Sequence, residues 1–131
     1  MSRTIISTQA APAAPPSYSQ AVKAAGLVFV SGTAPIDPST GGLIKGPVQA
    51  QVAQCLRNIS AILTAAGSSL EKAVSATLFV ADEEDFAGAS RLIRSSQTKG
   101  YLASLRPSGS GQKAGDCSTC CARATHWSSG G

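Results

Sequence analysis

The longest regular pattern of apolar residues runs from residue 48 to residue 66. Apolar side chains recur there at the spacing of an α-helix, along one stripe of its surface. The stripe consists of Val48, Val52, Cys55, Leu56, Ile59, Ile62, Leu63 and Ala66. Most polar residues between Gln49 and Asn58 are assigned to the opposite side, and Gly67 stands where a glycine ends a helix. The pattern predicts an amphipathic helix laid on a sheet, with Cys55 in the core.

Shorter stretches rich in β-formers lie on either side of this helix. Residues 3–8, 27–32 and 73–81 each contain the β-branched and apolar residues that are typical of a strand. In the third stretch the side chains expected on one face are Val74, Ala76, Leu78 and Val80. These stretches predict three strands of a common sheet.

A turn is predicted between the second of these strands and the helix. In residues 37–42, Pro38 fixes one φ angle and a glycine supplies the positive φ that closes the turn. Leu43 and Ile44 are therefore expected to begin a return strand, which would complete a hairpin.

Four consecutive acidic residues, Asp82 to Asp85, precede a second predicted helix that begins at Phe86. Carboxylates suit the positive N-terminal end of a helix. We therefore interpret the cluster as a solvated cap rather than as a catalytic site. The order of the elements predicts an α+β fold with its helices on one face of the sheet.

The net charge of +4 is unevenly distributed. Residues 1–90 carry five basic and six acidic side chains, whereas residues 91–131 carry six basic side chains and Asp116 as the single acid. We interpret this basic tail as a solvated segment, with weak binding to polyanions as the alternative. The strongest apolar run, Leu27–Val30, is far too short to span a membrane. We expect no membrane association and a cytoplasmic location, with a mitochondrial location as the alternative.

The tail also differs from the rest of the chain in hydrophobicity. Between Arg106 and Gly131 there is no Val, Ile, Leu, Met or Phe. Such a stretch has little apolar surface to offset the entropy lost on ordering. We therefore predict a folded domain over residues 1–90 and a divergent, disordered tail over residues 91–131, with the C-terminal strands of the sheet missing. A frameshift, unusual splicing or a gene-model error is our hypothesis for this tail.

Cysteines in the tail raise the question of a metal site. Cys117, Cys120, Cys121 and His126 include one C-x-x-C pair with a nearby histidine. A single pair is a weak signal, and adjacent cysteines fit a tetrahedral site poorly, so we predict no metal. A disulfide framework is the other interpretation of the cysteines, and the expected reducing compartment disfavours it.

Several motifs follow one another over about residues 4–90. They are Ala11-Pro-Ala-Ala-Pro-Pro-Ser-Tyr-Ser-Gln-Ala-Val22, Val28-Phe-Val-Ser-Gly32, Pro35-Ile-Asp-Pro-Ser-Thr-Gly41, residues 51–63 and Ala65-Ala-Gly67. Leu78-Phe-Val-Ala-Asp82 and Asp85-Phe86 continue the series. Together, and in this order, they resemble the RidA family, also called the YjgF family.

The resemblance implies a chorismate-mutase-like (RidA-like) α+β fold, with a mixed sheet, two helices on one face and homotrimeric assembly around sites between subunits. It implies hydrolysis of 2-iminobutanoate, 2-iminopropanoate and related enamines to 2-keto acids and ammonia. The implied partner is a small imine or enamine substrate, and no metal or organic cofactor is implied. Loss of the C-terminal strands would expose sheet edges and weaken such a trimer.

The resemblance also implies site residues. Tyr18 matches a tyrosine that lines the pocket, although its other interpretation is a core aromatic, and Ser31 and Gly32 match the pocket backbone. In the family, an arginine after Pro-Ala grips the substrate carboxylate and a later glutamate positions or activates the water. This chain has no Pro-Ala-Arg segment and no glutamate after Glu84. Arg106 is the remaining candidate for the carboxylate clamp.

A non-catalytic function is the alternative to the enzymatic one. The chain would then be a RidA-fold binding protein or a translation-modulating, RNA-directed protein. Release of ammonia from freshly generated 2-iminobutanoate distinguishes the enzyme from this alternative. A steep salt dependence of RNA retention would instead identify the polyanion-binding tail.

Overall fold

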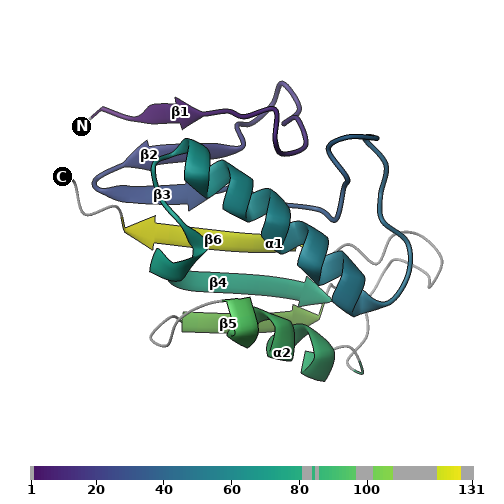
Figure 1. Ribbon diagram of the computed structural model, residues 1–131. Helices are drawn as coiled ribbons and strands as arrows, with labels where there is room; N and C mark the ends of the chain where they lie inside the picture. The colour runs from purple at the N-terminus through teal and green to yellow at the C-terminus, as the bar shows by residue number, and fades with distance from the viewer. Residues whose placement is uncertain (1, 81–83, 85, 97–101, 108–120, 128–131) are drawn as a thin grey trace.

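A computed structural model describes residues 2–80, 84, 86–96, 102–107 and 121–127. Within these residues, six strands form one mixed sheet in the order β1-β2-β3-β6-β4-β5 (Figure 1). All neighbouring pairs are antiparallel except β4 and β5, which are parallel. The strands are β1 (Thr4–Ile6), β2 (Ala21–Ala24), β3 (Leu27–Val30), β4 (Ala73–Val80), β5 (Leu102–Pro107) and β6 (Cys121–Trp127).

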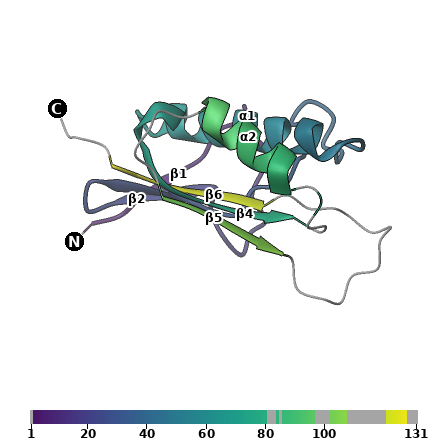
Figure 2. The same ribbon diagram turned by 90° about the horizontal axis from the view of Figure 1, so that it is seen from below.

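Two helices cover one face of this sheet. Helix α1 (Val48–Ala65) and helix α2 (Phe86–Ser96) lie on the same side, as Figure 2 shows, and a short 3-10 turn, η1 (Leu70–Lys72), leads into β4. This arrangement confirms the predicted α+β class with two helices on one face. No helix in the described ranges has the length and apolar character that crossing a bilayer requires.

Helix α1 ends one residue earlier than the periodicity predicted. Gly67 terminates it, as its position in the sequence indicated. The N–H of Gly67 donates to the carbonyl of Thr64 at 3.0 Å, and the N–H of Ser68 donates to the carbonyl of Leu63 at 2.8 Å. This pair of bonds is the Schellman motif, which needs a left-handed residue after the helix. Gly67 supplies it with φ +80°.

The core lies between α1 and the central strands. Because side chains alternate across a strand, β3 and β4 each send every second residue toward the helices. The fully buried members include Val28, Val30 and Leu78 from the strands and Val52, Cys55, Ile59 and Leu63 from α1. The expected burial of Cys55 is confirmed.

The expectation that the C-terminal strands are missing is wrong. Strand β6 lies between β3 and β4, and β5 extends the sheet beyond β4. A strand between two neighbours is held by its backbone N–H and C=O groups, which every residue except proline supplies. The lack of large aliphatic residues after Arg106 therefore did not prevent pairing of Cys121–Trp127. The parts of the predicted disordered tail at 97–101, 108–120 and 128–131 lie outside the described residues.

Three smaller features also differ from the sequence-based expectations. Strand β2 was not predicted, because four residues with two alanines carry little pattern. Leu43 forms only an isolated bridge with Ile36, so the return strand is absent although the turn is present. Val74 is 41 % exposed because the register of β4 against β6 shifts between Ala73 and Ser75, which removes Val74 from the apolar face.

Candidate functional site

A cavity of about 180 Å³ opens where the loop before β2, the loop after β3 and helix α1 meet. The loop before β2 contributes its proline- and alanine-rich part, Tyr18 and Gln20, and the loop after β3 contributes residues 31–34 and Ile36. Ile62 of α1 forms the apolar floor. The cavity is thus built from segments distant in sequence.

The first wall of the cavity is fixed by Gln20. Its side chain is 6 % exposed, and its Nε2 donates to the carbonyls of Pro12 at 2.7 Å and Thr8 at 3.0 Å, with a longer contact of 3.4 Å to Ala11. Its Oε1 accepts from the N–H of Thr8 at 2.6 Å. One buried amide therefore holds residues 8–12, which an irregular proline-rich segment could not hold through its own backbone bonds.

The second wall is tied to the first wall and to α1. The Ser31 hydroxyl donates to the carbonyl of Ser19 at 2.6 Å, and the Thr33 hydroxyl donates to the carbonyl of Ser31 at 3.1 Å. The buried Cys55 thiol lies 3.5 Å from the carbonyl of Thr33. These contacts place the Ser31–Gly32 backbone beside the loop that carries Tyr18.

Three of the residues singled out from the sequence line this cavity together: Tyr18, Ser31 and Gly32. Tyr18 is 52 % exposed, so it is not a core aromatic. Tyr18 lines the cavity and is open to solvent, so its hydroxyl can meet a ligand or a water. The Ser31 hydroxyl proton is engaged with Ser19, which leaves its oxygen able to accept a hydrogen bond.

Arg106 lies elsewhere in the chain. Its Cα pairs with Phe79 in the β4–β5 ladder, and β5 stands three strands from β3 in the sheet. At the usual strand spacing this separation is roughly 14 Å, more than an extended arginine side chain reaches. The side chain of Arg106 is outside the described residues. Any contact between Arg106 and the cavity would therefore involve a second copy of the chain.

Among the described residues that line the cavity, none is charged at neutral pH. Its polar groups are the Tyr18 and Ser31 hydroxyls, the Thr33 hydroxyl, backbone peptides and the Gln20 amide, which is already saturated by the loop. The lining can orient a small polar molecule through neutral hydrogen bonds. Gripping an anion would require a cation from outside this set.

Sequence reasoning missed the amides that build the site. Gln54 and Asn58 were assigned to the solvent side of the helix, but they are 6 % and 1 % exposed. Their oxygens and nitrogens bond to one another and to the loop after β3. A signal was available, because this side of the predicted helix carries amides where a solvated face usually carries Lys and Glu.

The other candidates contribute nothing to this cavity in the described part of the chain. Of the acidic cluster, Asp82, Glu83 and Asp85 lie outside the described residues, and Glu84 is exposed. Cys117 and Cys120 also lie outside them, while Cys121 and His126 fall within β6. No group of three or more metal-ligating side chains occurs within the residues that the structure describes.

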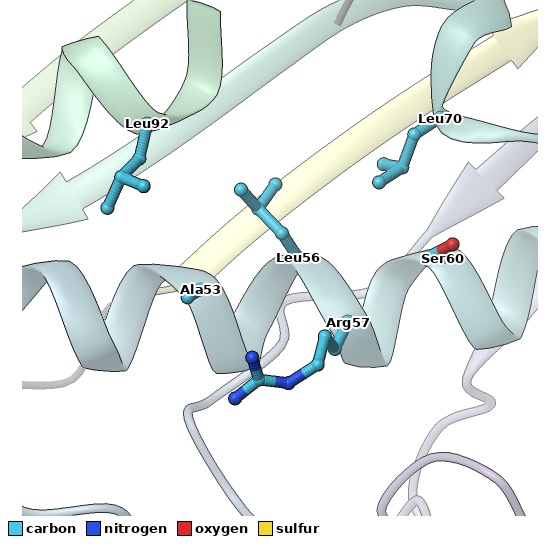
Figure 3. A pocket seen from close by; sticks show the side chains of 6 residues that line it. All are labelled: Ala53, Leu56, Arg57, Ser60, Leu70 and Leu92. Carbon is cyan, nitrogen blue, oxygen red and sulfur yellow. The ribbon is translucent and has the colours of Figure 1, made fainter. Parts of the chain in front are cut away.

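A larger cavity of about 310 Å³ lies on the outer side of the helical layer, away from Tyr18. Figure 3 shows Leu56 of α1 pointing between Leu70 and Leu92, while the guanidinium group of Arg57 points away from them. The cavity is an open groove between α1, η1 and α2. Its lining is mostly apolar, with Arg57 and Ser60 as the polar members, and it contains none of the residues that the motifs singled out. The smaller cavity, which contains three of them, is therefore the candidate site.

Comparison with known proteins places this chain in one family. The family model described as "Endoribonuclease L-PSP" matches residues 8–104. A RutC family protein of Pyrococcus horikoshii is 45 % identical over 85 residues, which are 65 % of this chain and 68 % of that protein. The mouse protein named 2-iminobutanoate/2-iminopropanoate deaminase is 43 % identical over 84 residues, 64 % of this chain and 62 % of its own length.

A solved structure agrees with the fold over nearly the whole chain. The crystal structure of Escherichia coli TdcF with bound serine matches with a TM-score of 0.84 and 30 % identity, over 96 % of this chain and 99 % of that one. The class defined by the sheet, the two helices and the cavity is therefore the RidA-like α+β fold. The chain belongs to the endoribonuclease L-PSP family, which is the RidA family that its motifs resemble.

Proposed function

We propose that the chain is an imine and enamine deaminase, which hydrolyses small 2-imino acids such as 2-iminobutanoate and 2-iminopropanoate to 2-keto acids and ammonia. The observation that carries this proposal is the convergence of Tyr18, Ser31 and Gly32 on one cavity. Relatives that bear the deaminase name share 43–45 % of their aligned residues with this chain. Both observations point to a site for a small polar substrate.

The size of the cavity supports a substrate of this kind. Pockets for drug-sized ligands usually measure roughly 300–1,000 Å³. About 180 Å³ instead suits a molecule of a few heavy atoms. The serine bound in the TdcF structure is a molecule of this size and, like a 2-imino acid, carries a carboxylate and a nitrogen on C2. Ile62 provides an apolar surface for a short side chain, and Tyr18 and Ser31 provide polar contacts.

The reaction requires few catalytic groups from the protein, because the imine carbon is already electrophilic. Water adds through its oxygen to the electrophilic imine carbon, a proton moves to the nitrogen, the C–N bond breaks, and ammonia leaves as the C=O bond forms. The step consumes one water and transfers no electrons. The protein contributes by holding the substrate and aligning the water. We assign the alignment to the Tyr18 hydroxyl and the binding to the Ser31–Gly32 backbone.

A carboxylate in this cavity needs a cation that the described lining does not supply. We propose that the site is completed by a second copy in a homotrimer, with Arg106 as the candidate clamp. The sheet face opposite the helices supports association, because Ile5, Val22 and Phe29 are directly paired across β1, β2 and β3. Ile5 is 62 % exposed and Phe29 43 %, so this apolar row has surface to bury.

The experiment is to generate 2-iminobutanoate in the presence of the full chain and to follow ammonia and 2-oxobutanoate. The expected result is hydrolysis well above the buffer rate, with Tyr18→Phe reducing kcat/KM by about ten-fold or more because it removes one hydroxyl and keeps the ring. A rate equal to buffer would remove the proposal for this chain. Retention of RNA with a steep salt dependence would then favour the polyanion-binding tail.

A further inference from the structure

One side chain makes two hydrogen bonds from inside the molecule to the cavity wall after β3. Asn58 of α1 is 1 % exposed, and its Nδ2 donates to the carbonyls of Ala34 at 3.2 Å and Ile36 at 2.9 Å. Both Ala34 and Ile36 line the cavity. Because no regular strand holds this segment, the two bonds set where the wall stands relative to the Ile62 floor.

The orientation of this amide is fixed by its neighbours. Two carbonyl oxygens face Nδ2, so the opposite orientation would set Asn58 Oδ1 against two acceptors. Asn58 Oδ1 must then accept, and it does so from Gln54 Nε2 at 2.9 Å. Gln54 Oε1 in turn accepts from an Arg57 guanidinium nitrogen at 2.8 Å. Arginine can only donate, so the relay runs in one direction, from Arg57 at the surface to the cavity wall.

From this relay we propose that Asn58 is a positioning residue for substrate binding, with Gln54 and Arg57 as its orienting partners. The proposal rests on the function proposed for the cavity. Asn58 does not line the cavity and touches no reacting atom; it acts through the carbonyls of Ala34 and Ile36. Its role is to keep the wall at the distance from Tyr18 that a small substrate needs, and its loss should therefore weaken substrate binding more than turnover.

The same helix offers a matched control. Gln51 is also buried, at 6 % exposure, and its Nε2 also donates to a loop carbonyl, that of Gly46 at 3.0 Å. Gly46 does not line the cavity. Asn58→Asp and Gln51→Glu therefore make the same chemical change, an amide to an acid, at two buried sites on one helix. The bonds from Asn58 reach the cavity wall, whereas the bond from Gln51 reaches Gly46, which does not line the cavity.

The first readout is steady-state kinetics on freshly generated 2-iminobutanoate. Asn58→Asp is expected to raise KM about ten-fold and to leave kcat within about three-fold, which is the signature of lost ground-state binding. Gln51→Glu is expected to change both constants less than about two-fold. Equal effects of the two variants, or a fall in kcat alone for Asn58→Asp, would overturn the proposal. If Asn58→Asp does not fold, Gln54→Met takes its place, because it breaks the relay with an apolar side chain of similar volume and should raise KM about three-fold.

The second readout does not depend on activity. Hydrogen exchange followed by mass spectrometry should show faster exchange in residues 31–36 for Asn58→Asp, while Gln51→Glu should change exchange around Gly46 instead. If the unmodified chain shows no hydrolysis, the proposed function fails, and this measurement still decides the role of Asn58 in holding the wall. Unchanged exchange in residues 31–36 would refute that role in either case.

Discussion

The side-chain amide of Gln20 donates a hydrogen bond of 2.7 Å to the carbonyl oxygen of Pro12, and this bond joins the start of β2 to the proline-rich wall of the cavity. In Gln20→Glu, a carboxylate oxygen would replace the amide nitrogen that donates to three carbonyls. We expect a loss of about 2–3 kcal/mol in the free energy of unfolding, because buried acceptors lose their partner. Chemical denaturation measures this loss.

Gln9→Glu is the control for this change. Gln9 lies in the same segment but is exposed, so the substitution introduces the same charge without removing a buried donor. Its unfolding midpoint should stay within the error of the unmodified protein. Similar losses in the two variants would show that charge in this segment, rather than the Gln20 amide, determines its stability.

Gly67 allows a second prediction about stability. A Cβ at this position would meet no atom within 4 Å, so Gly67→Ala is limited only by its φ of +80°. Alanine in the left-handed region costs about 1 kcal/mol, and the unfolding free energy should fall by that amount. Gly42→Ala, in the loop before α1 and without a positive φ, should be close to neutral. A neutral Gly67→Ala would contradict the Schellman assignment.

Helix α1 was predicted within one residue because its pattern repeats over five turns and ends at a glycine with a defined role. Strand β6 was not predicted, because it is held by pairing with the edges of β3 and β4, which lie far away in sequence. A local pattern cannot report a partner strand about 50 to 100 residues away. The same reason explains why the shift that exposes Val74 was missed.

The candidate site was also predicted only in part. Tyr18, Ser31 and Gly32 were identified because they stand in recognisable motifs, and the cavity brings them together. Gln20 and Asn58 were not identified as structural, because the role of an amide depends on which carbonyls surround it. Periodicity assigned Asn58 to solvent, and the loop after β3 covers it instead.

The turn between β2 and β3 gives a prediction in the stabilising direction. Its two residues, Ala25 and Gly26, have φ of +53° and +75°, as a type I′ hairpin turn requires. Asparagine is preferred at the first of these positions, and alanine is disfavoured. We expect Ala25→Asn to raise the free energy of unfolding by about 0.5–1 kcal/mol. Ala10→Asn, at an exposed position without positive φ, serves as the control in thermal denaturation, and an equal gain there would argue against the turn as the cause.

Asp37 predicts how stability depends on pH. Its Oδ1 accepts from the hydroxyl of Ser39 at 2.6 Å and from the N–H of Ser39 at 2.8 Å. These bonds, with a smaller contribution from the charge of Arg57, hold the pKa of Asp37 below its ordinary value. A lowered folded-state pKa gives stability that is present above about pH 4 and is lost as the pH falls further. Asp37→Asn should be less stable than the unmodified chain at pH 7, and the difference should shrink toward pH 2–3. A difference that is constant with pH would exclude the carboxylate as its source.

The apolar row Ile5–Val22–Phe29 tests the proposed assembly. Val28 and Val30 point toward the helices, so Phe29 between them points to the opposite face, which the helices leave uncovered (Figure 2). If this face is buried in a homotrimer, Phe29→Lys places a charge in each of three equivalent interfaces and removes about 1.5–3 kcal/mol of apolar burial per subunit. Native mass spectrometry should show a trimer for the unmodified chain and monomer for Phe29→Lys.

Leu43→Lys is the matched control for this assembly. Leu43 is 44 % exposed, close to the exposure of Phe29, but it lies in the loop after the turn at residues 37–42 and not in the row. The trimer should persist in this variant, because both changes replace an exposed apolar side chain with lysine and only the location differs. Since the cation of the proposed site comes from a neighbouring subunit, Phe29→Lys should also lose deaminase activity in proportion to the lost trimer. A monomer that retains full activity would show that one chain completes the site alone.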